Sequence, residues 1–179
     1  MGDELRGENL VHLNVRFSTE TELKRIQDFL YEKSGQGVSF TGLVEAMANE
    51  VTIVTAVHNI KSNKGSKTAG VDKIKMDKYL QMPKDELILL IQSCFRNYRP
   101  KPARREYIEK SNGKKRPLGI PTVLDRIIQE CVRIIIEPIC EARFYPQSYG
   151  FRPYRAQKHA IRGIINVINA GCKSPDQPV

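Results

Sequence analysis

The sequence predicts an α+β fold that is mostly helical, with packed helices and one β-hairpin. Apolar residues recur at three- and four-residue spacing along most of the 179-residue chain, which is typical of amphipathic helices. Residues 104–120 instead have an extended pattern around a Ser-Asn-Gly turn, which is typical of a hairpin. Because 40% of the residues are hydrophobic and 27% are charged, a packed core is expected and global disorder is not.

The first expected helix spans residues 19–33. Thr19 and Glu22 have the spacing of a capping box, in which each side chain bonds to the backbone of the other residue. Residues 1–17 before this helix are polar and have no periodicity, so we expect them to be frayed.

Two further helices are expected before the hairpin. One spans residues 43–61, and its apolar stripe, which we interpret as core packing, consists of Val51, Val54, Val57 and Ile60. The other follows Pro83 over residues 84–97, where apolar residues recur on one helical face. Between these helices, residues 62–72 are rich in Gly, Ser and Lys and predict a loop.

The strongest apolar periodicity comes after the hairpin. We expect a helix to begin at Thr122, whose side chain can cap it, with Asp125 at the third position. Asp125 is expected to act as a cap and as the partner of an arginine, not as a catalyst. Pro138 should kink or end this helix. A loop over 144–153 and a last helix over 156–170 complete the pattern.

The hairpin prediction depends on residues 111–113, Ser-Asn-Gly, and on the strands beside them. The returning strand contains Pro117, which cannot donate a backbone hydrogen bond, so this strand should lie at the edge of a sheet. Two turn forms are open. A two-residue turn would direct the side chains of Lys110 and Arg116 to opposite faces, whereas a three-residue turn ending at Gly113 would place them on a common face.

A basic hairpin tip has two interpretations. Lys110, Lys114, Lys115 and Arg116 could bind phosphate, because lysine offers a mobile charge and arginine a fork of donors. They could equally form an exposed turn that keeps the protein soluble, and the residues alone do not decide between the two. If Lys110 and Arg116 hold one phosphate chain, the three-residue turn is expected.

The charge balance favours a polyanionic partner. The net charge is +9, and between residues 96 and 116 nine Lys or Arg residues stand against two acids. Two tyrosines and two prolines interrupt this basic run, so we interpret it as a nucleic-acid contact rather than a solvated face. No apolar run approaches the roughly 20 residues that cross a bilayer, so no membrane contact is expected. The four cysteines and three histidines show no spacing of metal ligands.

Three blocks of the chain resemble those of group II intron reverse transcriptases, also called maturases. Residues 110–129, KSNGKKRPLGIPTVLDRIIQ, resemble the first core block of this family; residues 148–154, SYGFRPY, resemble the second; and residues 63–72, NKGSKTAGVD, resemble the preceding loop block. The blocks stand in family order, and the resemblance covers about residues 50–170. Tyr154, Arg155 and Ala156 depart from the residues that usually follow the second block.

The resemblance implies roles for individual residues. Lys110 and Arg116 match family contacts to the triphosphate of the incoming nucleotide, and Arg104 lies close to them. The resemblance also implies that Arg152 supports the loop under the nucleotide site, with a purely structural salt bridge as the alternative. The residues expected to contact template or other RNA are Asn63, Lys64, Gly65, Lys67, Gly70, Arg105, Lys114, Lys115, Ile120, Pro121 and Arg152.

At the level of the whole chain, the resemblance implies the fingers subdomain of a right-hand polymerase. Residues 1–40 would be an N-terminal extension with one helix, 41–170 the fingers region, and 171–179 a linker to a palm. No catalytic residue, metal site or cofactor is expected in the chain itself, and two Mg²⁺ ions are expected in the full-length enzyme.

The implied parent is an RNA-directed DNA polymerase that also acts in intron splicing and retrohoming. Its expected partners are group II intron RNA, an RNA template with a DNA primer, and a deoxynucleoside triphosphate, in the cytoplasm of a bacterial-type host or in an organelle. A homodimer is left open. Two alternatives also remain: a non-catalytic module that binds intron RNA, and the fingers of a retron or CRISPR-associated reverse transcriptase.

Overall fold

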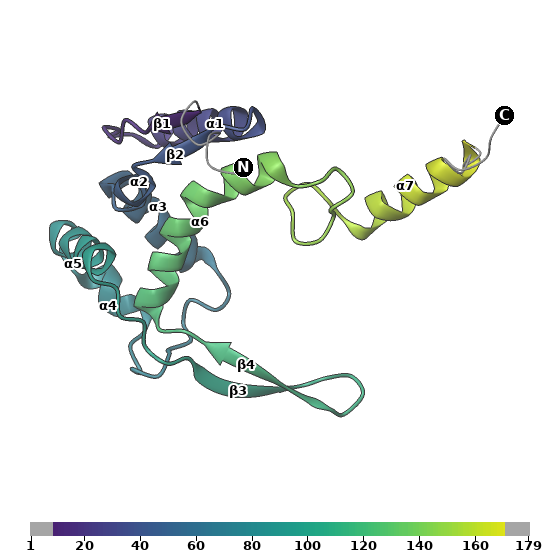
Figure 1. Cartoon of the computed structure of the whole chain (residues 1–179). Helices are drawn as coiled ribbons and strands as arrows, with labels where there is room; N and C mark the ends of the chain where they lie inside the picture. The colour runs from purple at the N-terminus through teal and green to yellow at the C-terminus, as the bar shows by residue number, and fades with distance from the viewer. Residues whose placement is uncertain (1–8, 171–179) are drawn as a thin grey trace, which may run out of the picture.

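The computed structural model describes residues 9–170 and has an α+β fold with seven helices and two two-stranded sheets over these residues (Figure 1). This confirms the expected class. The predicted linker, residues 171–179, lies outside the described part of the chain. The elements in chain order are β1 (Leu10–His12), α1 (Glu20–Gly35), β2 (Ser39–Thr41), α2 (Leu43–Met47), α3 (Glu50–Ser62), α4 (Met76–Gln81), α5 (Lys84–Arg96), β3 (Arg104–Glu109), β4 (Lys115–Ile120), α6 (Val123–Arg143) and α7 (Gln157–Asn169).

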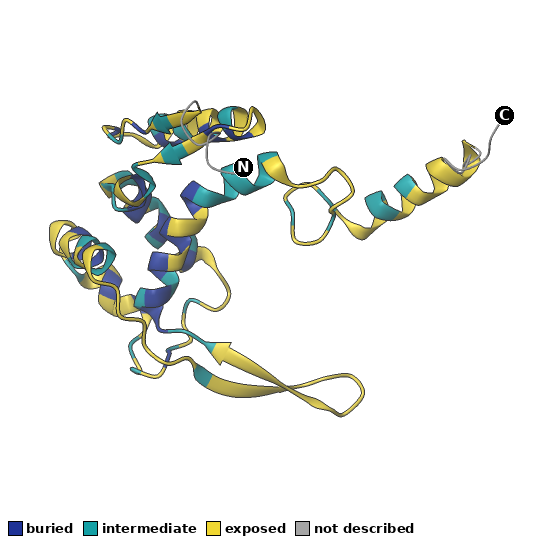
Figure 2. Ribbon diagram, viewed as in Figure 1, coloured by how far each residue is buried: buried dark blue, intermediate teal, exposed yellow. Residues whose placement is uncertain are grey.

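The core is built around α6, the longest helix, which contacts α1, α2, α3 and α5. Figure 2 shows the buried residues concentrated along α6 and the helix faces turned toward it. Each fully buried isoleucine or leucine stabilises the fold by about 1.5–3 kcal/mol through the apolar surface removed from water. The fully buried large apolar side chains include Leu23, Leu30, Ile53, Ile91, Val123, Ile127 and Ile135.

The N-terminal segment is more ordered than its sequence indicates. Residues 10–12 form β1, which pairs in parallel with β2, and Leu13 and Phe17 are buried in the common core. The expectation that residues 1–17 are frayed is therefore wrong for the part that is described. The apolar residues of this segment are too few and too irregularly spaced to reveal a strand whose partner lies about 29 residues later. The expected boundary after residue 40 falls within β2.

The expected helix over 43–61 is two helices, separated at Ala48 and Asn49. Asn49 ends the first and caps the second, because its Oδ1 accepts a hydrogen bond of 2.8 Å from the amide of Val51. Its Nδ2 donates to the carbonyls of Val15 and Phe17 at 3.0 and 3.1 Å. One asparagine thus starts α3 and ties the N-terminal segment to it.

The apolar stripe expected on α3 is confirmed in part. Ile60 is buried and Val51 and Val57 pack, partly buried, against the core, whereas Val54 is 43% exposed. The buried face consists of Thr52, Ile53, Ala56 and Ile60. A buried threonine is accommodated there because its hydroxyl donates to the carbonyl of Ala46 at 2.8 Å.

Other expected elements are confirmed closely. Thr19 and Glu22 form the predicted capping box of α1, and α5 begins directly after Pro83. The last helix, α7, occupies the predicted residues but buries none of them. The sequence pattern missed the short helix α4 and both strands of the first sheet.

Pro138 does not end α6, which continues to Arg143. A proline at this position has no amide to bond to the carbonyl four residues earlier, which is that of Ile134. That carbonyl accepts a hydrogen bond of 2.9 Å from Nε2 of Gln27 on α1. Gln27 of α1 therefore pairs with the Ile134 carbonyl of α6, which Pro138 leaves without its helical hydrogen bond.

Candidate nucleic-acid and nucleotide interface

The hairpin of β3 and β4 projects from the helical body (Figure 1) and is mostly exposed (Figure 2). Its turn is the three-residue form. The amide of Lys110 donates to the carbonyl of Lys114 at 2.8 Å, and the amide of Gly113 donates to the carbonyl of Lys110 at 2.9 Å. Gly113 has a φ of 75°, in the left-handed region that glycine adopts without strain. The predicted turn is confirmed.

The register of the hairpin decides which charges lie together. Ile108 pairs with Arg116, and the turn places Lys110 opposite Lys114. Since side chains alternate between faces, Lys110, Lys114 and Arg116 share one face, which we call the grip face. Like charges directly opposite each other are destabilising, so an anion bound between these side chains would relieve a repulsion.

The opposite face of the hairpin carries Arg105, Tyr107, Lys115 and Pro117, with the acid Glu109 directly opposite Lys115. Pro117 pairs with Tyr107, three positions from the hydrogen-bonded pair at the turn. Because hydrogen-bonded and non-hydrogen-bonded pairs alternate in an antiparallel ladder, this is a position at which the missing amide of proline removes no hydrogen bond. The hairpin therefore has cations on both faces, with an exposed tyrosine beside them.

Arg104 lies at the base of the hairpin, on the same face as the grip face. Its Nη1 is 2.6 Å from Oε1 of Glu106, two residues along the strand. Its Nε is buried without a hydrogen-bond partner among the described residues. The charge of Arg104 is thus largely offset by Glu106, while its guanidinium keeps donors that a ligand could use.

The junction between β4 and α6 is held by a small hydrogen-bond network. Thr122 caps α6 through the amide of Asp125 at 3.1 Å, and its hydroxyl donates to Oδ2 of Asp125 at 2.6 Å. The hydroxyl of Tyr98 donates to the other oxygen, Oδ1, at 2.9 Å. Burial, and then this bond, raise the pKa of Tyr98 to about 12. Asp125 takes part in the predicted cap, but its carboxylate accepts from the hydroxyls of Thr122 and Tyr98, so the expected arginine is wrong.

The loop of residues 63–72 packs beside this junction. The guanidinium of Arg126 holds it, with Nη1 donating to the carbonyl of Gly65 at 2.8 Å and Nη2 to that of Thr68. Gly70 is buried against the backbone of Thr122, where a Cβ would lie 2.6 Å from the Thr122 Cα. Packing against protein therefore accounts for Gly70.

The same loop leaves Asn63, Lys64, Gly65 and Lys67 exposed. At the other end of this loop, Gly70 lies against the backbone of Pro121 and Thr122. Arg126, which makes this arrangement, was missed by sequence reasoning. Its partners lie about 60 residues earlier in the chain, so no local pattern reveals them.

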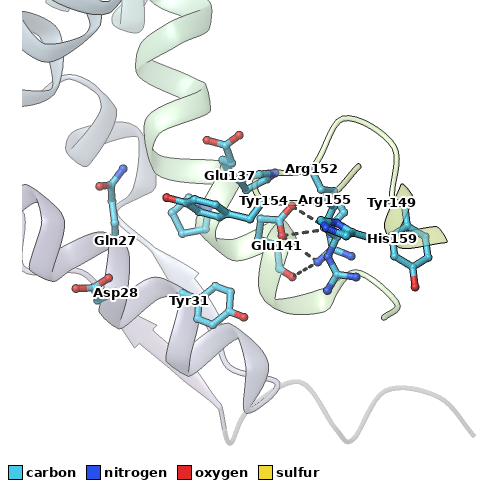
Figure 3. Close-up of a pocket in the computed structure, with 12 residues that line it drawn as sticks. Gln27, Asp28, Tyr31, Glu137, Glu141, Tyr149, Arg152, Tyr154, Arg155 and His159 are labelled. Carbon is cyan, nitrogen blue, oxygen red and sulfur yellow. Dashed lines mark hydrogen bonds and ion pairs between the residues drawn. The ribbon is translucent and has the colours of Figure 1, made fainter. Parts of the chain in front are cut away.

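Arg152 is not near the hairpin. It lies beyond the C-terminal end of α6, whereas β4 leads into the N-terminal end (Figure 1), and a 21-residue helix is about 30 Å long. The Arg152 side chain is only 6% exposed, and its Nη2 is 2.9 Å from Oε2 of Glu141. It also donates to the carbonyls of Tyr145 and Ser148 (Figure 3 shows the ion pair). This geometry supports the structural salt bridge, and a contact of Arg152 with RNA stays a prediction.

The described residues offer neither a metal site nor a membrane span. Within residues 9–170, no group of three or more His, Cys, Asp or Glu side chains is arranged to hold a metal ion. The two Mg²⁺ ions are expected in the full-length enzyme and stay a prediction. No helix in the same range is long and apolar enough to cross a bilayer.

Comparison with known proteins identifies relatives of this chain. No protein-family model matches it. It is 42% identical over 127 residues to the group II intron-encoded protein LtrA of Lactococcus lactis subsp. cremoris, covering 70% of this chain and 21% of that protein. It is 34% identical over 161 residues to an uncharacterized 91 kDa protein in the cob intron of Schizosaccharomyces pombe, covering 85% of this chain and 20% of that protein.

A third relative is the mitochondrial nuclear intron maturase 1 of Arabidopsis thaliana, which is 32% identical over 117 residues, or 65% of this chain and 14% of that protein. The chain spans about a fifth of the length of the first two relatives. Similarity to an intron-encoded protein of a bacterium, a protein in a yeast intron and an intron maturase of a plant agrees with the three sequence blocks. The chain belongs to the family of group II intron-encoded proteins and maturases.

Proposed function

We propose that this chain is the fingers region of an RNA-directed DNA polymerase that also binds intron RNA, and that its hairpin binds the triphosphate of the incoming nucleotide. The observation that carries the proposal is the grip face, on which Lys110, Lys114 and Arg116 lie together at a turn of fixed register. The lysines supply mobile charges and Arg116 a fork that can bridge two phosphate oxygens. Membership of the intron-encoded family supports the assignment.

The proposed template contact lies at the base of the hairpin. Ile120 and Pro121 are half-buried at the junction with α6, and the loop of residues 63–72 is fixed beside them by Arg126. In this arrangement the exposed Lys64 and Lys67 would contact the backbone of the template strand, and the junction would lie against its bases. Arg105 and Lys115, on the other face of the hairpin, would contact RNA phosphates.

The chain itself is proposed to bind nucleotide and RNA, and no bond-making step is assigned to it. Two-metal polymerisation requires carboxylates that align both ions, and the chain spans only about a fifth of the length of its relatives. Polymerisation, primer binding and the two Mg²⁺ ions are therefore proposed for the longer parent protein.

The register of the hairpin provides a matched test. Lys110→Ala and Arg116→Ala each remove a cation from the grip face, and Lys115→Ala removes one from the opposite face. Binding of a fluorescent deoxynucleoside triphosphate, measured by anisotropy, should weaken about tenfold in the first two variants, because a hydrogen bond to a charged group contributes about 1.5–3 kcal/mol. Lys115→Ala should change it by about twofold at most, as is usual for an exposed charge. Equal losses in all three variants would show a diffuse charge effect and contradict the grip.

The cations on both faces of the hairpin favour a second candidate, a non-catalytic module that binds intron RNA. In that case Lys110→Ala and Arg116→Ala would abolish binding of intron RNA by the chain, instead of sparing it. In either case RNA binding should fall steeply with salt, since each neutralised phosphate releases counterions. Comparing RNA and nucleotide binding of the same variants separates the two candidates.

A further inference from the structure

The loop that joins α6 to α7, residues 144–155, exposes an unusual number of aromatic side chains. We call it the aromatic loop. Phe151 and Tyr154 are fully exposed, Tyr145 is 82% exposed and Phe144 is 48% exposed. Large aromatic side chains are normally among the most buried in a protein. Packing within the described chain therefore gives no reason for the rings of Phe151 and Tyr154.

The backbone at these two residues is also unfavourable. Phe151 has a φ of 57° and Tyr154 a φ of 58°, and only one other non-glycine residue in the described range has a positive φ. Side chains with a Cβ avoid this left-handed conformation, whereas glycine adopts it freely. The loop thus keeps two bulky residues where glycine would be more stable, and each ring points to solvent. Such outliers are typical of functional positions.

Arg152, which lies between the two aromatic residues, holds the loop in this shape. Its Nε and Nη2 bond the carboxylate of Glu141, and its Nη1 bonds the carbonyls of Tyr145 and Ser148 at 2.9 and 3.0 Å. Arg155 bonds the carbonyl of Pro146. Figure 3 shows the contacts of Arg152 with Glu141. The aromatic residues are therefore presented on a fixed framework, which lowers the entropic cost of binding a ligand.

The charge around the loop indicates the kind of ligand. Residues 142–170 contain five Lys or Arg residues and no Asp or Glu. Arg152 is neutralised by Glu141, but Lys158 and Arg162 are exposed on α7. Exposed aromatic rings interleaved with cations and without acids are the composition of surfaces that bind unpaired nucleic acid, where bases stack and phosphates pair with cations.

Acidic groups lie on one side of the loop only. An open cavity of about 770 Å³ between α1, α6 and the loop is lined by the acids Asp28, Glu137 and Glu141 and also by Tyr154 (Figure 3). Glu137 and Glu141 are paired with Arg133 and Arg152. Phosphates would be repelled from Asp28 and attracted to α7, so a bound strand would direct its phosphates toward α7 and its bases toward the loop.

We propose that the aromatic loop is a second RNA site, in which Phe151 and Tyr154 stack on unpaired bases while Lys158 and Arg162 contact the phosphates. The site is separated from the hairpin by the length of α6. It rests on the proposed function only in taking RNA as its ligand. It does not require the hairpin to bind nucleotide.

The test measures binding of the 179-residue chain to fluorescein-labelled oligoadenylate and to an abasic oligomer of equal length and charge. Phe151→Ala and Tyr154→Ala should each weaken binding of oligoadenylate by about fivefold or more, as expected for loss of one stacked base. Binding of the abasic oligomer should stay within about twofold of the unmodified chain, because only phosphate contacts remain. Leu89→Ala, which removes a 61% exposed apolar side chain on α5, is the control and should change neither.

Two glycine variants exclude a folding defect. Phe151→Gly and Tyr154→Gly remove the rings and also relieve the left-handed backbone, so they should raise the melting temperature while weakening oligoadenylate binding. Undiminished binding of oligoadenylate by these variants would overturn the proposal and assign the rings to a protein contact. If the nucleotide grip is wrong instead, Lys110→Ala and Arg116→Ala would leave nucleotide binding unchanged, while Phe151→Ala and Tyr154→Ala would still weaken binding of oligoadenylate.

Discussion

Replacing Gln27 by alanine should destabilise the protein, because a main-chain carbonyl of α6 would lose its hydrogen-bond donor. The variant removes the 2.9 Å hydrogen bond from Gln27 Nε2 to the carbonyl of Ile134, which Pro138 leaves without its helical partner. An unpaired buried carbonyl costs about 1–3 kcal/mol. Release of the glutamine side chain returns up to about 2 kcal/mol of rotamer entropy, which offsets part of this cost. We expect a net loss of about 1–2 kcal/mol, or a fall of about 2–8 °C in melting temperature.

The assay is a double-mutant cycle with Pro138→Ala, followed by thermal and urea unfolding. Alanine restores an amide at position 138, which can bond the carbonyl of Ile134 within the helix. In that background Gln27→Ala should cost about 0.5 kcal/mol or less, so the two sites should couple by about 1 kcal/mol. Gln92→Ala is the matched control, because Gln92 Nε2 donates to the carbonyl of Ala48 at 3.0 Å, away from the proline. An equal cost of Gln27→Ala in both backgrounds would refute the reasoning.

Two further predictions concern packing and pH. Gly70→Ala should destabilise the protein by about 1–3 kcal/mol in urea unfolding, because its Cβ would lie 2.6 Å from the backbone of Thr122. Gly150→Ala is the control and should be neutral, because its Cβ would have no atom within 4 Å. Equal stability of the two variants would exclude the close approach of Gly70 to Thr122. The melting temperature should fall as the pH drops below about 4.5, and Glu130→Gln should reduce that fall. Burial raises the pKa of Glu130, but its hydrogen bonds, chiefly with Arg133, lower it below its usual value, so the stability it contributes above pH 4.5 is lost on protonation. An unchanged pH profile in Glu130→Gln would contradict this.

Features that depend on neighbouring residues could be predicted from the sequence. The capping box of Thr19 and Glu22 is completed within four residues. The three-residue turn needs a glycine at its last position, and Gly113 is there, so local geometry allowed this form, although the residues alone left the two-residue turn open. In both cases the chemistry that fixes the backbone lies within the segment itself.

Features that depend on distant partners could not be predicted. The break at Asn49 is stabilised by carbonyls of Val15 and Phe17, more than 30 residues earlier. Without that contact, the apolar spacing of residues 43–61 fits one continuous helix and includes Val54, which the structure leaves exposed. The position of the loop over 63–72 depends in the same way on Arg126, since the loop has almost no apolar residues to specify where it packs.

The length of α6 has a consequence for how RNA of different sizes would be held. Because one rigid helix separates the hairpin from the aromatic loop by about 30 Å, a single strand that reaches both sites would be bound bivalently. The second contact then forms at a high effective concentration, and avidity can exceed either separate affinity by about 10²–10⁴-fold. Shorter strands would engage one site at a time and dissociate quickly. Helix α6 would in this way favour RNA strands long enough to span both sites, whatever their base sequence.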